Sequence, residues 1–406
     1  MNGICRHILR QCPQSQGTTA IRKILLVFGT RPEAIKMAPV IRAFLDSEAE
    51  LDLQVCVTGQ HRQMLDQVLD LFKIIPNFDL DLMTSGQSLS DINAAILVKI
   101  NTIILEEKPD LILVHGDTST SMSTALASFF AGVPVGHVEA GLRTYDVRAP
   151  YPEEFNRQMI SKVASYHFAP TNQCKENLLN ERVNPNSIWV TGNTVIDALK
   201  YTLQLIHNDI TMRNHLYSDL FEKLNFDFMS TKYILITGHR RENFGEGFVS
   251  ICSSIKGMAD KFPNLHFVYP VHLNPNVYEP VHRMLGENRN IHLIEPQDYL
   301  HFLLLLENCY LVLTDSGGIQ EEAPSLGKPV LVMRDKTERS EVLISGAVKL
   351  VGTDKSKILT EVTRLIEDEN YYCSMSQTES PYGDGTAAAQ IIGILDRELN
   401  YHWKSK

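Results

Sequence analysis

Two acidic residues stand directly after two apolar, β-rich segments of the chain. Asp117 follows the segment 111–115 closely, and Glu139 follows the segment 133–138. If these segments are neighbouring parallel strands, a strand spacing of about 4.8 Å brings the two carboxylates near one another. Repulsion between them would keep one protonated and the other ionised, as general acid and general base catalysis require. The pattern therefore predicts proton-transfer chemistry at one edge of a sheet.

The same residues also have purely structural interpretations. Asp117 could cap a following helix, and Glu139 could pair with Arg143. A third acidic site, Pro-Glu-Glu at 152–154, is typical of a first helical turn, because proline suits that position and acidic side chains favour the positive end of the helix dipole. Capping accounts for at least one of these two glutamates, and a catalytic one must point into a cleft.

Basic residues follow two other strand-like segments. Arg31 and Lys36 come after 24–28, at the start of a predicted helix. Cations oppose the dipole at a helix N-terminus, so a bound anion explains them better than helix stability does. The sequence Gly-His-Arg-Arg at 238–241 follows the segment 233–237 in the same way. Both clusters indicate binding of an anionic group.

A small-residue turn, Asp-Ser-Gly-Gly at 315–318, follows the apolar segment 311–314. Small residues allow backbone N–H groups and a helix N-terminus to approach phosphate oxygens closely. A carboxylate about one turn into that helix could accept hydrogen bonds from a ribose diol. Placed opposite Arg31 and Lys36, this turn predicts a site for a nucleotide diphosphate.

The elements that must position these residues form two series of short strands alternating with helical segments, which is typical of parallel sheets covered by helices. We therefore expect an α/β fold of two Rossmann-like, doubly wound domains facing a central cleft. The segment 194–232 between the series reads as a helix followed by a polar, irregular connection. The expected division is a tail (1–22), a first domain (23–192), a second domain (193–378) and a C-terminal segment whose helix packs back on the first domain (379–406).

Composition excludes several other classes of protein. The chain has 406 residues with 38 basic and 48 acidic side chains, a net charge of −10, so general affinity for nucleic acid or an anionic membrane is not expected. No apolar run approaches the length of a membrane span, and no secretory signal is recognisable at the start. The seven scattered cysteines contain no C-x-x-C pair, and no metal-binding motif is present. We expect a cytoplasmic enzyme without a metal site.

Taken together and in order, five motifs resemble those of the non-hydrolysing UDP-N-acetylglucosamine 2-epimerases: 27–36, 115–118, 138–144, 237–242 and 315–324. The resemblance runs from about Lys23 to the final helix. It implies a glycosyltransferase-B-like pair of domains and the interconversion of UDP-GlcNAc and UDP-ManNAc. The implied route is anti elimination of UDP to 2-acetamidoglucal followed by re-addition of UDP, with no cofactor.

The resemblance also implies roles for individual residues. The acid and base set would be Asp117, Glu139 and Glu153, with His239 assisting near the sugar and diphosphate. Substrate-binding residues would be Arg31 and Lys36 on the phosphate side, Ser316, Gly317 and Gly318 at the diphosphate, Glu322 at the ribose, Gln297 and Phe302 near the uracil, and Arg339 as a further ligand. Gln60 and Gln63 match positions associated with a second, activating UDP-GlcNAc in some members. A homodimer is expected.

The chain departs from the family pattern at Ser340, where proline is common, and at Tyr145, where a small residue is frequent. Neither difference removes a chemical group. Three alternatives differ in function: a hydrolysing epimerase, whose first motif usually continues differently from Gly-Thr-Arg-Pro-Glu at 29–33; a glycosyltransferase, which would not need three acids on the first domain; and a catalytically silent nucleotide-sugar sensor. The retained acids and His239 favour the epimerase.

Overall fold

The computed structural model describes residues 21–403 apart from 48, 50, 60–61 and 85, and it contains two parallel sheets. The first has the strand order β3-β2-β1-β4-β5-β6-β7 and the second β10-β9-β8-β11-β12-β13. The first sheet consists of β1 (Arg22–Phe28), β2 (Leu51–Val57), β3 (Phe78–Asp79), β4 (Leu111–His115), β5 (Val135–Val138), β6 (Tyr166–Ala169) and β7 (Ile188–Val190). The second consists of β8 (Tyr233–Thr237), β9 (His266–Pro270), β10 (Ile291–Ile294), β11 (Leu311–Thr314), β12 (Val330–Val332) and β13 (Val348–Leu350). The predicted α/β class is confirmed.

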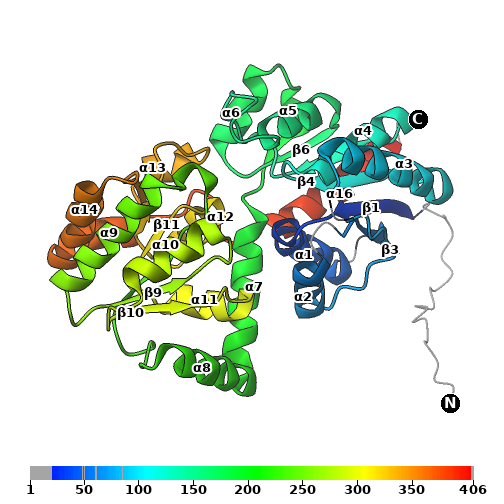
Figure 1. Ribbon diagram of the computed structural model, residues 1–406. Coiled ribbons are helices and arrows are strands. Elements are labelled where there is room, and N and C mark those ends of the chain that lie inside the picture. The colour runs from blue at the N-terminus through cyan, green and yellow to red at the C-terminus, as the bar shows by residue number, and fades with distance from the viewer. Residues whose placement is uncertain (1–20, 48, 50, 60–61, 85, 404–406) are drawn as a thin grey trace, which may run out of the picture.

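Helices flank both sheets, and α7 runs between the two lobes of the molecule (Figure 1). In the first half they are α1 (Arg31–Asp46), α2 (Arg62–Phe72), α3 (Leu89–Glu107), α4 (Ser119–Ala131), α5 (Glu153–Val163), α6 (Asn172–Asn180) and α7 (Thr194–Asn208). The remainder are α8 (Ile210–Leu224), α9 (Glu246–Lys261), α10 (Pro275–Leu285), α11 (Tyr299–Asn308), α12 (Gly317–Ser325), α13 (Ser340–Ser345), α14 (Lys355–Glu367), α15 (Glu369–Ser376) and α16 (Ala387–Trp403). Among the described residues, no helix combines the length and apolarity needed to cross a membrane.

The two sheets share one topology. Counted from its own first strand, each sheet has the order 3-2-1-4-5-6, and the first adds β7 beyond that. The direction of winding therefore reverses between β1 and β4 in one half and between β8 and β11 in the other. In open α/β sheets, ligands bind beyond the carboxyl ends of the strands at this reversal. Four of the loops that carry the predicted chemistry follow these four strands, and the loop with Glu139 follows the neighbouring strand β5.

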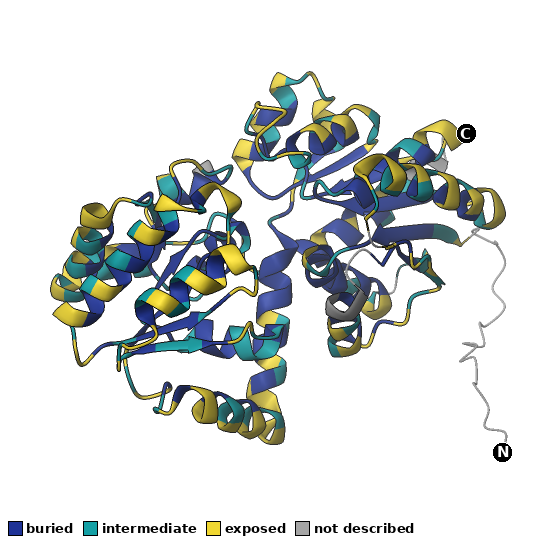
Figure 2. Cartoon of the chain, in the orientation of Figure 1, coloured by how far each residue is buried: buried dark blue, intermediate teal, exposed yellow. Residues whose placement is uncertain are grey.

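One hydrophobic core joins the two halves. Leu26 of β1, Leu199 of α7 and Leu235 of β8 are fully buried members of the same cluster. Helix α7 is buried along most of its length, as the dark blue ribbon between the lobes shows (Figure 2). Burial of this shared apolar surface favours a fixed arrangement of the two sheets.

The prediction of an irregular connection before β8 was wrong, because a second helix, α8, follows α7 directly. Asp209 ends α7, and its side chain caps α8 by accepting a hydrogen bond from a backbone N–H in the first turn. A buried leucine recurs every fourth residue, which gives α8 an apolar stripe: Leu216, Leu220 and Leu224. Polar residues such as Ser218 lie on its exposed face and do not interrupt the helix.

The C-terminal helix α16 packs against α1 and α7. The Asp197 carboxylate of α7 accepts hydrogen bonds from the backbone N–H groups of Ala387 (3.3 Å) and Ala388 (2.9 Å) at the start of α16. Burial raises the pKa of Asp197 to about 6 despite these bonds. The exact domain limits at 192 and 378 stay predictions.

Candidate active site

A cavity of about 370 Å³ lies where the carboxyl ends of the two sheets meet. The first half contributes side chains from the loops after β1, β4 and β5 and from the start of α5: Thr30, Glu33, Lys36, His115, Asp117, Glu139, Glu153 and Arg157. The second half contributes the loops after β8 and β11 and the segment before α13: Arg240, Ser316, Gly317, Gly318, Glu338 and Arg339. Acidic and basic groups from both halves thus face one space.

Most of the residues predicted from the sequence line this cavity, but several do not. Those that line it are Lys36, Asp117, Glu139, Glu153, Ser316, Gly317, Gly318 and Arg339. Residues outside its lining are Arg31, His239, Gln297, Phe302 and Glu322. Gln60 lies outside the described residues, and of Gln63 only the backbone in α2 is described. Within the described chain, no three His, Cys, Asp or Glu side chains are grouped as metal ligands.

Asp117 and Glu139 follow neighbouring strands, as expected, because β4 and β5 pair in parallel. Both structural alternatives for these residues were wrong. The N-cap of α4 is Thr118, whose side chain accepts from the third residue of the helix. Arg143 pairs with Glu181 (Nε to Oε1, 2.6 Å) and not with Glu139. Helix capping and a local ion pair therefore do not explain the two acids.

The Glu139 carboxylate is buried beside an ammonium group. Its Oε2 atom contacts Lys36 Nζ, accepts a hydrogen bond from Asn193 Nδ2 (2.9 Å) and lies 3.8 Å from His115 Nε2. Burial alone would raise the pKa of Glu139, but the charges of Lys36 and of nearby His115 and Arg339 hold it well below its usual range. The backbone of Glu139 has φ +64°, an uncommon conformation for a residue with a side chain.

Lys36 links the two halves of the site. Its ammonium contacts Glu139 of the first half and lies 3.0 Å from Glu321 Oε2 of α12 in the second half. Arg339 holds the other oxygen of Glu321 (Nε to Oε1, 2.7 Å). Burial opposes the charge on Lys36, but these two carboxylates raise the pKa of Lys36 above its ordinary value. Sequence analysis had no signal for Glu321, because its partner Lys36 lies in the other half of the chain.

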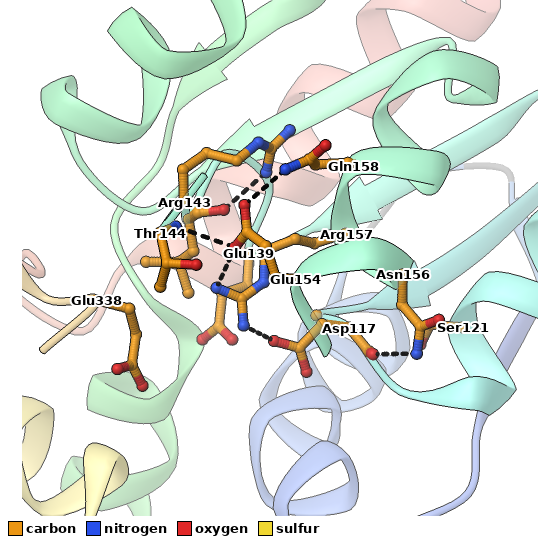
Figure 3. A network of polar contacts seen from close by, with 12 residues as sticks. Asp117, Ser121, Glu139, Arg143, Thr144, Glu154, Asn156, Arg157, Gln158 and Glu338 are labelled. Atoms are coloured by element: carbon orange, nitrogen blue, oxygen red, sulfur yellow. Dashed lines mark hydrogen bonds and ion pairs between the residues drawn. The ribbon is translucent and has the colours of Figure 1, made fainter. Parts of the chain in front are cut away.

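The two adjacent glutamates at the start of α5 have different surroundings, and Figure 3 shows those of Glu154. Glu153 is partly exposed and lines the cavity, whereas Glu154 is fully buried. The Glu154 carboxylate accepts hydrogen bonds from the backbone N–H groups of Thr144 (2.9 Å) and Tyr145 (3.0 Å). Glu154 thus has a structural role, and Glu153 is the glutamate of this pair that faces the cavity.

The side chain of Glu33 occupies the N-terminus of α1. Glu33 Oε2 accepts from the backbone N–H groups of Gly29 (3.0 Å) and Thr30 (2.8 Å), while Oε1 accepts from the hydroxyls of Thr118 (2.7 Å) and Ser121 (3.0 Å). Burial raises the pKa of Glu33 in spite of these donors. The glutamate of the first motif is therefore part of the framework around the cavity.

The N-terminus of α12 is open by comparison. Ser316 occupies its N-cap position, and the Ser316 side chain makes no capping hydrogen bond within the described structure. A Cβ atom at Gly317 would lie 2.6 Å from Arg339 Nη1, so the guanidinium can sit against the helix start only if residue 317 is glycine. Buried Asp315 accepts from the backbone N–H groups of His239 and Arg240 (2.9 Å each) and ties that loop to the end of β11.

A second set of polar side chains, outside the cavity lining, surrounds Glu322. Tyr299 Oη donates to Glu322 Oε1 (3.1 Å), and Arg31 interacts electrostatically with Asp298 and Glu322. Burial raises the pKa of Glu322 to about 7, although the hydrogen bond from Tyr299 opposes that shift. Burial also lowers the pKa of Arg31, against the effect of both carboxylates. Arg31 of the first half thus lies within electrostatic range of Glu322 of the second half.

The remaining predicted residues have other neighbours. The ring of His239 stacks on His272 with centroids 5.5 Å apart, and burial lowers the pKa of His239 despite nearby Asp315. Gln297 accepts from Lys223 Nζ (3.0 Å), and Phe302 packs against the main core. Their proposed roles toward a nucleotide are not visible in these contacts.

Titration of Glu322 is expected to make stability depend on pH. Its folded pKa, about 7, lies above the ordinary 4.5 of glutamate, so the folded state keeps a proton that the unfolded state loses. The contribution of Glu322 to stability should fall by up to about 3 kcal/mol as pH rises from about 4.5 to about 7, and change little above that. A Glu322→Gln variant should lack this contribution. Urea unfolding of both proteins at about pH 5 and about pH 8 measures it, and an equal difference at the two pH values would contradict it.

Comparisons with known proteins agree with this arrangement. The UDP-N-acetylglucosamine 2-epimerase profile matches residues 43–396. The UDP-N-acetylglucosamine 2-epimerases of Escherichia coli K12 and Yersinia pestis are 53% and 55% identical, each over 92% of this chain and 98% of the relative. The crystal structure of the Neisseria meningitidis UDP-GlcNAc 2-epimerase bound to UDP-GlcNAc is 49% identical with a TM-score of 0.86, covering 92% of this chain and 99% of that one. The Methanocaldococcus jannaschii enzyme in complex with UDP-GlcNAc and UDP is 33% identical with a TM-score of 0.78, over the same shares. This chain belongs to the UDP-N-acetylglucosamine 2-epimerase family.

Proposed function

We propose that this protein interconverts UDP-GlcNAc and UDP-ManNAc by eliminating UDP and adding it back, without net hydrolysis. The observation that carries the proposal is the shared cavity, in which Asp117, Glu139 and Glu153 face the glycine-rich start of α12. Proton-transfer groups and an anion site are both needed for this reaction. The relatives whose structures contain UDP-GlcNAc or UDP support the choice of substrate.

The reaction assigns a distinct task to each half of the cavity. A carboxylate takes the proton from C2, the C1–O bond breaks with its electrons passing to UDP, and a C1–C2 double bond remains. Re-addition of the UDP oxygen to C1, with a proton delivered to the other face of C2, gives the epimer. Asp117, Glu139 and Glu153 supply the proton transfers. The start of α12, with Arg339 and Arg240, retains UDP between the two steps.

The other predicted residues complete the substrate site in this proposal. Arg31 and Glu322 serve the phosphates and ribose, and His239 lies on the diphosphate side. Gln297 and Phe302 belong to the uracil end. Gln60 and Gln63 are assigned to a second, activating UDP-GlcNAc.

Lys36 makes the basicity of Glu139 depend on bound substrate. An ionised carboxylate paired with a buried ammonium is a weak proton acceptor. A diphosphate bound at α12 competes for the Lys36 ammonium, since phosphate oxygens attract it as strongly as the carboxylates do. Removing Lys36 from Glu139 would raise the proton affinity of that carboxylate at the moment of the reaction.

Incubation with UDP-GlcNAc in deuterium oxide is expected to yield UDP-ManNAc with deuterium at C2, because the abstracted proton exchanges with solvent on the carboxylate. A proton NMR time course follows both the new sugar signals and loss of the C2 proton signal. The same sample without enzyme is the control. Free ManNAc and UDP as the final products would contradict the proposal and favour a hydrolysing epimerase.

We infer that the protein is a homodimer associated through α3 and α4. These adjacent helices expose large apolar side chains: Val98 (66%), Leu105 (64%), Phe129 (57%) and Phe130 (66%). A contiguous apolar patch on a protein surface marks an interaction site, and we infer that these side chains form such a patch. Replacing Phe129 and Phe130 together by serine is expected to give a monomer in light scattering. Phe221→Ser on exposed α8 is the control, and a dimer that survives the double change would place the interface elsewhere.

A further inference from the structure

Arg157 of α5 lies between two carboxylates at the edge of the cavity. Its Nη2 atom donates to Asp117 Oδ2, and its Nη1 atom lies 3.3 Å from Glu154 Oε2 (Figure 3). The two acids come from different elements, since Asp117 follows β4 and Glu154 lies in the first turn of α5. The planar guanidinium therefore fixes the distance between the loop after β4 and the helix.

The residues of this contact differ in burial. Arg157 is 4% exposed and Glu154 is fully buried, whereas the side chain of Asp117 is 25% exposed and lines the cavity. A buried guanidinium must stay paired, because an unpaired buried charge is costly. Arg157 and Glu154 thus form the fixed side of the contact, and Asp117 is the carboxylate that they present to the cavity.

Glu154 is itself anchored from three directions. Besides the backbone N–H groups of Thr144 and Tyr145, its carboxylate accepts from Gln158 Nε2 (2.8 Å). Tyr145 adopts φ +62°, so the hydrogen bond from its N–H helps to hold a strained loop residue. The same loop begins at Glu139, and the N-terminal part of α5 consequently holds the loops that carry Asp117 and Glu139.

A further hydrogen bond from α5 holds the backbone of Asp117. Asn156, which precedes Arg157 in α5, donates from Nδ2 to the carbonyl oxygen of Asp117 (2.8 Å). Consecutive residues of one helix therefore bind the main chain and the side chain of the same aspartate. A cap or a surface ion pair would need one of these contacts and not both.

We propose that Arg157, anchored by Glu154, is a positioning residue that holds the Asp117 carboxylate in the orientation needed for proton transfer. This inference rests on the proposed function, in which Asp117 is an acid or base. Arg157 acts through Asp117 and needs no contact with the substrate. Misplacement of a reacting group by about 1 Å can cost about 100-fold in rate, so the effect of losing Arg157 should fall on kcat.

The test compares Arg157→Gln, Arg157→Lys and Glu154→Gln with the wild type. Arg157→Gln should lower kcat about 100-fold with KM and UDP affinity nearly unchanged, and Arg157→Lys should recover part of the loss because one charged contact remains. Glu154→Gln should lower kcat to a smaller extent. The control is Lys162→Gln, which removes an exposed cation from the same helix and should leave kcat unchanged. Thermal unfolding and UDP titration show that each variant is folded.

Combination with Asp117→Asn separates positioning from general structural damage. If Arg157 acts only through Asp117, its replacement by Gln or Lys costs nothing further in the Asp117→Asn background. If the two losses multiply, or if Arg157→Gln keeps full kcat in an active enzyme, the inference is overturned. A wild type without epimerase activity would instead overturn the proposed function together with it. If Arg157→Gln does not fold, the test rests on kcat of Arg157→Lys, measured in the wild-type and in the Asp117→Asn backgrounds.

Discussion

Replacing Asp117 by Asn or Glu139 by Gln is expected to lower kcat by about two to four orders of magnitude, while UDP still binds. Each change removes a proton-transfer group from the cavity and keeps nearly the same volume. Neither touches the start of α12, where the diphosphate is proposed to lie. Steady-state assays with UDP-GlcNAc give kcat, and isothermal titration with UDP gives the affinity.

The control for this experiment lies at the other end of the same strand. Asp110 precedes β4 and pairs with Arg22 (3.1 Å), far from the cavity lining. Asp110→Asn makes the same chemical change as Asp117→Asn and should leave kcat nearly unaltered. Loss of UDP binding in both cavity variants, with folding intact, would show that the two acids have structural roles and would contradict the proposed proton transfers.

Lys36→Met is expected to lower the free energy of unfolding by about 3 to 5 kcal/mol near neutral pH. The variant leaves Glu139 and Glu321 buried without the ammonium that both contact. Because the pKa of Glu139 is held low in the folded state, the stabilisation that Lys36 provides is present above the ordinary pKa of glutamate and is lost as pH falls. Urea unfolding followed by circular dichroism measures the difference.

Lys261→Met provides the matched comparison. Lys261 pairs with Glu367 at 3.1 Å, but both side chains are about half exposed. Water screens that pair, so its removal should change stability only slightly. Equal losses in the two variants would mean that the Lys36 contacts between the halves contribute no more than a surface ion pair, and would remove the basis for an exchange of Lys36 between Glu139 and a diphosphate.

Local patterns were sufficient for much of the fold. Short apolar segments ended by glycine or acidic residues identified the strands, and β4 and β11 begin and end where the sequence placed them. The two-residue strand β3 has too few residues to show a pattern. Helix α8 was missed because polar residues on its exposed face resembled breakers, while its leucine spacing was the available signal.

The site was harder to predict because its decisive contacts are distant in sequence. Strand ends pointed correctly to the loops that meet in the cavity. The partners of those residues could not be inferred: Lys36 and Glu321 are joined only when the two sheets face each other, and Arg157 reaches Asp117 from a helix forty residues later. Which glutamate of the 153–154 pair faces the cavity likewise depends on the position of the loop that Glu154 holds.

The side chain of Glu33 makes the two halves unequal in the backbone N–H groups that they leave open. Both halves have the same strand order, and in either half a helix that begins after one of the two central strands could receive a phosphate. In the first half the start of α1 already holds a carboxyl group of the same chain, since the backbone N–H groups of Gly29 and Thr30 donate to Glu33. The shared topology is thereby divided: Glu33 occupies the start of α1 from within, while the N-cap residue of α12, Ser316, makes no capping hydrogen bond of its own in the described structure.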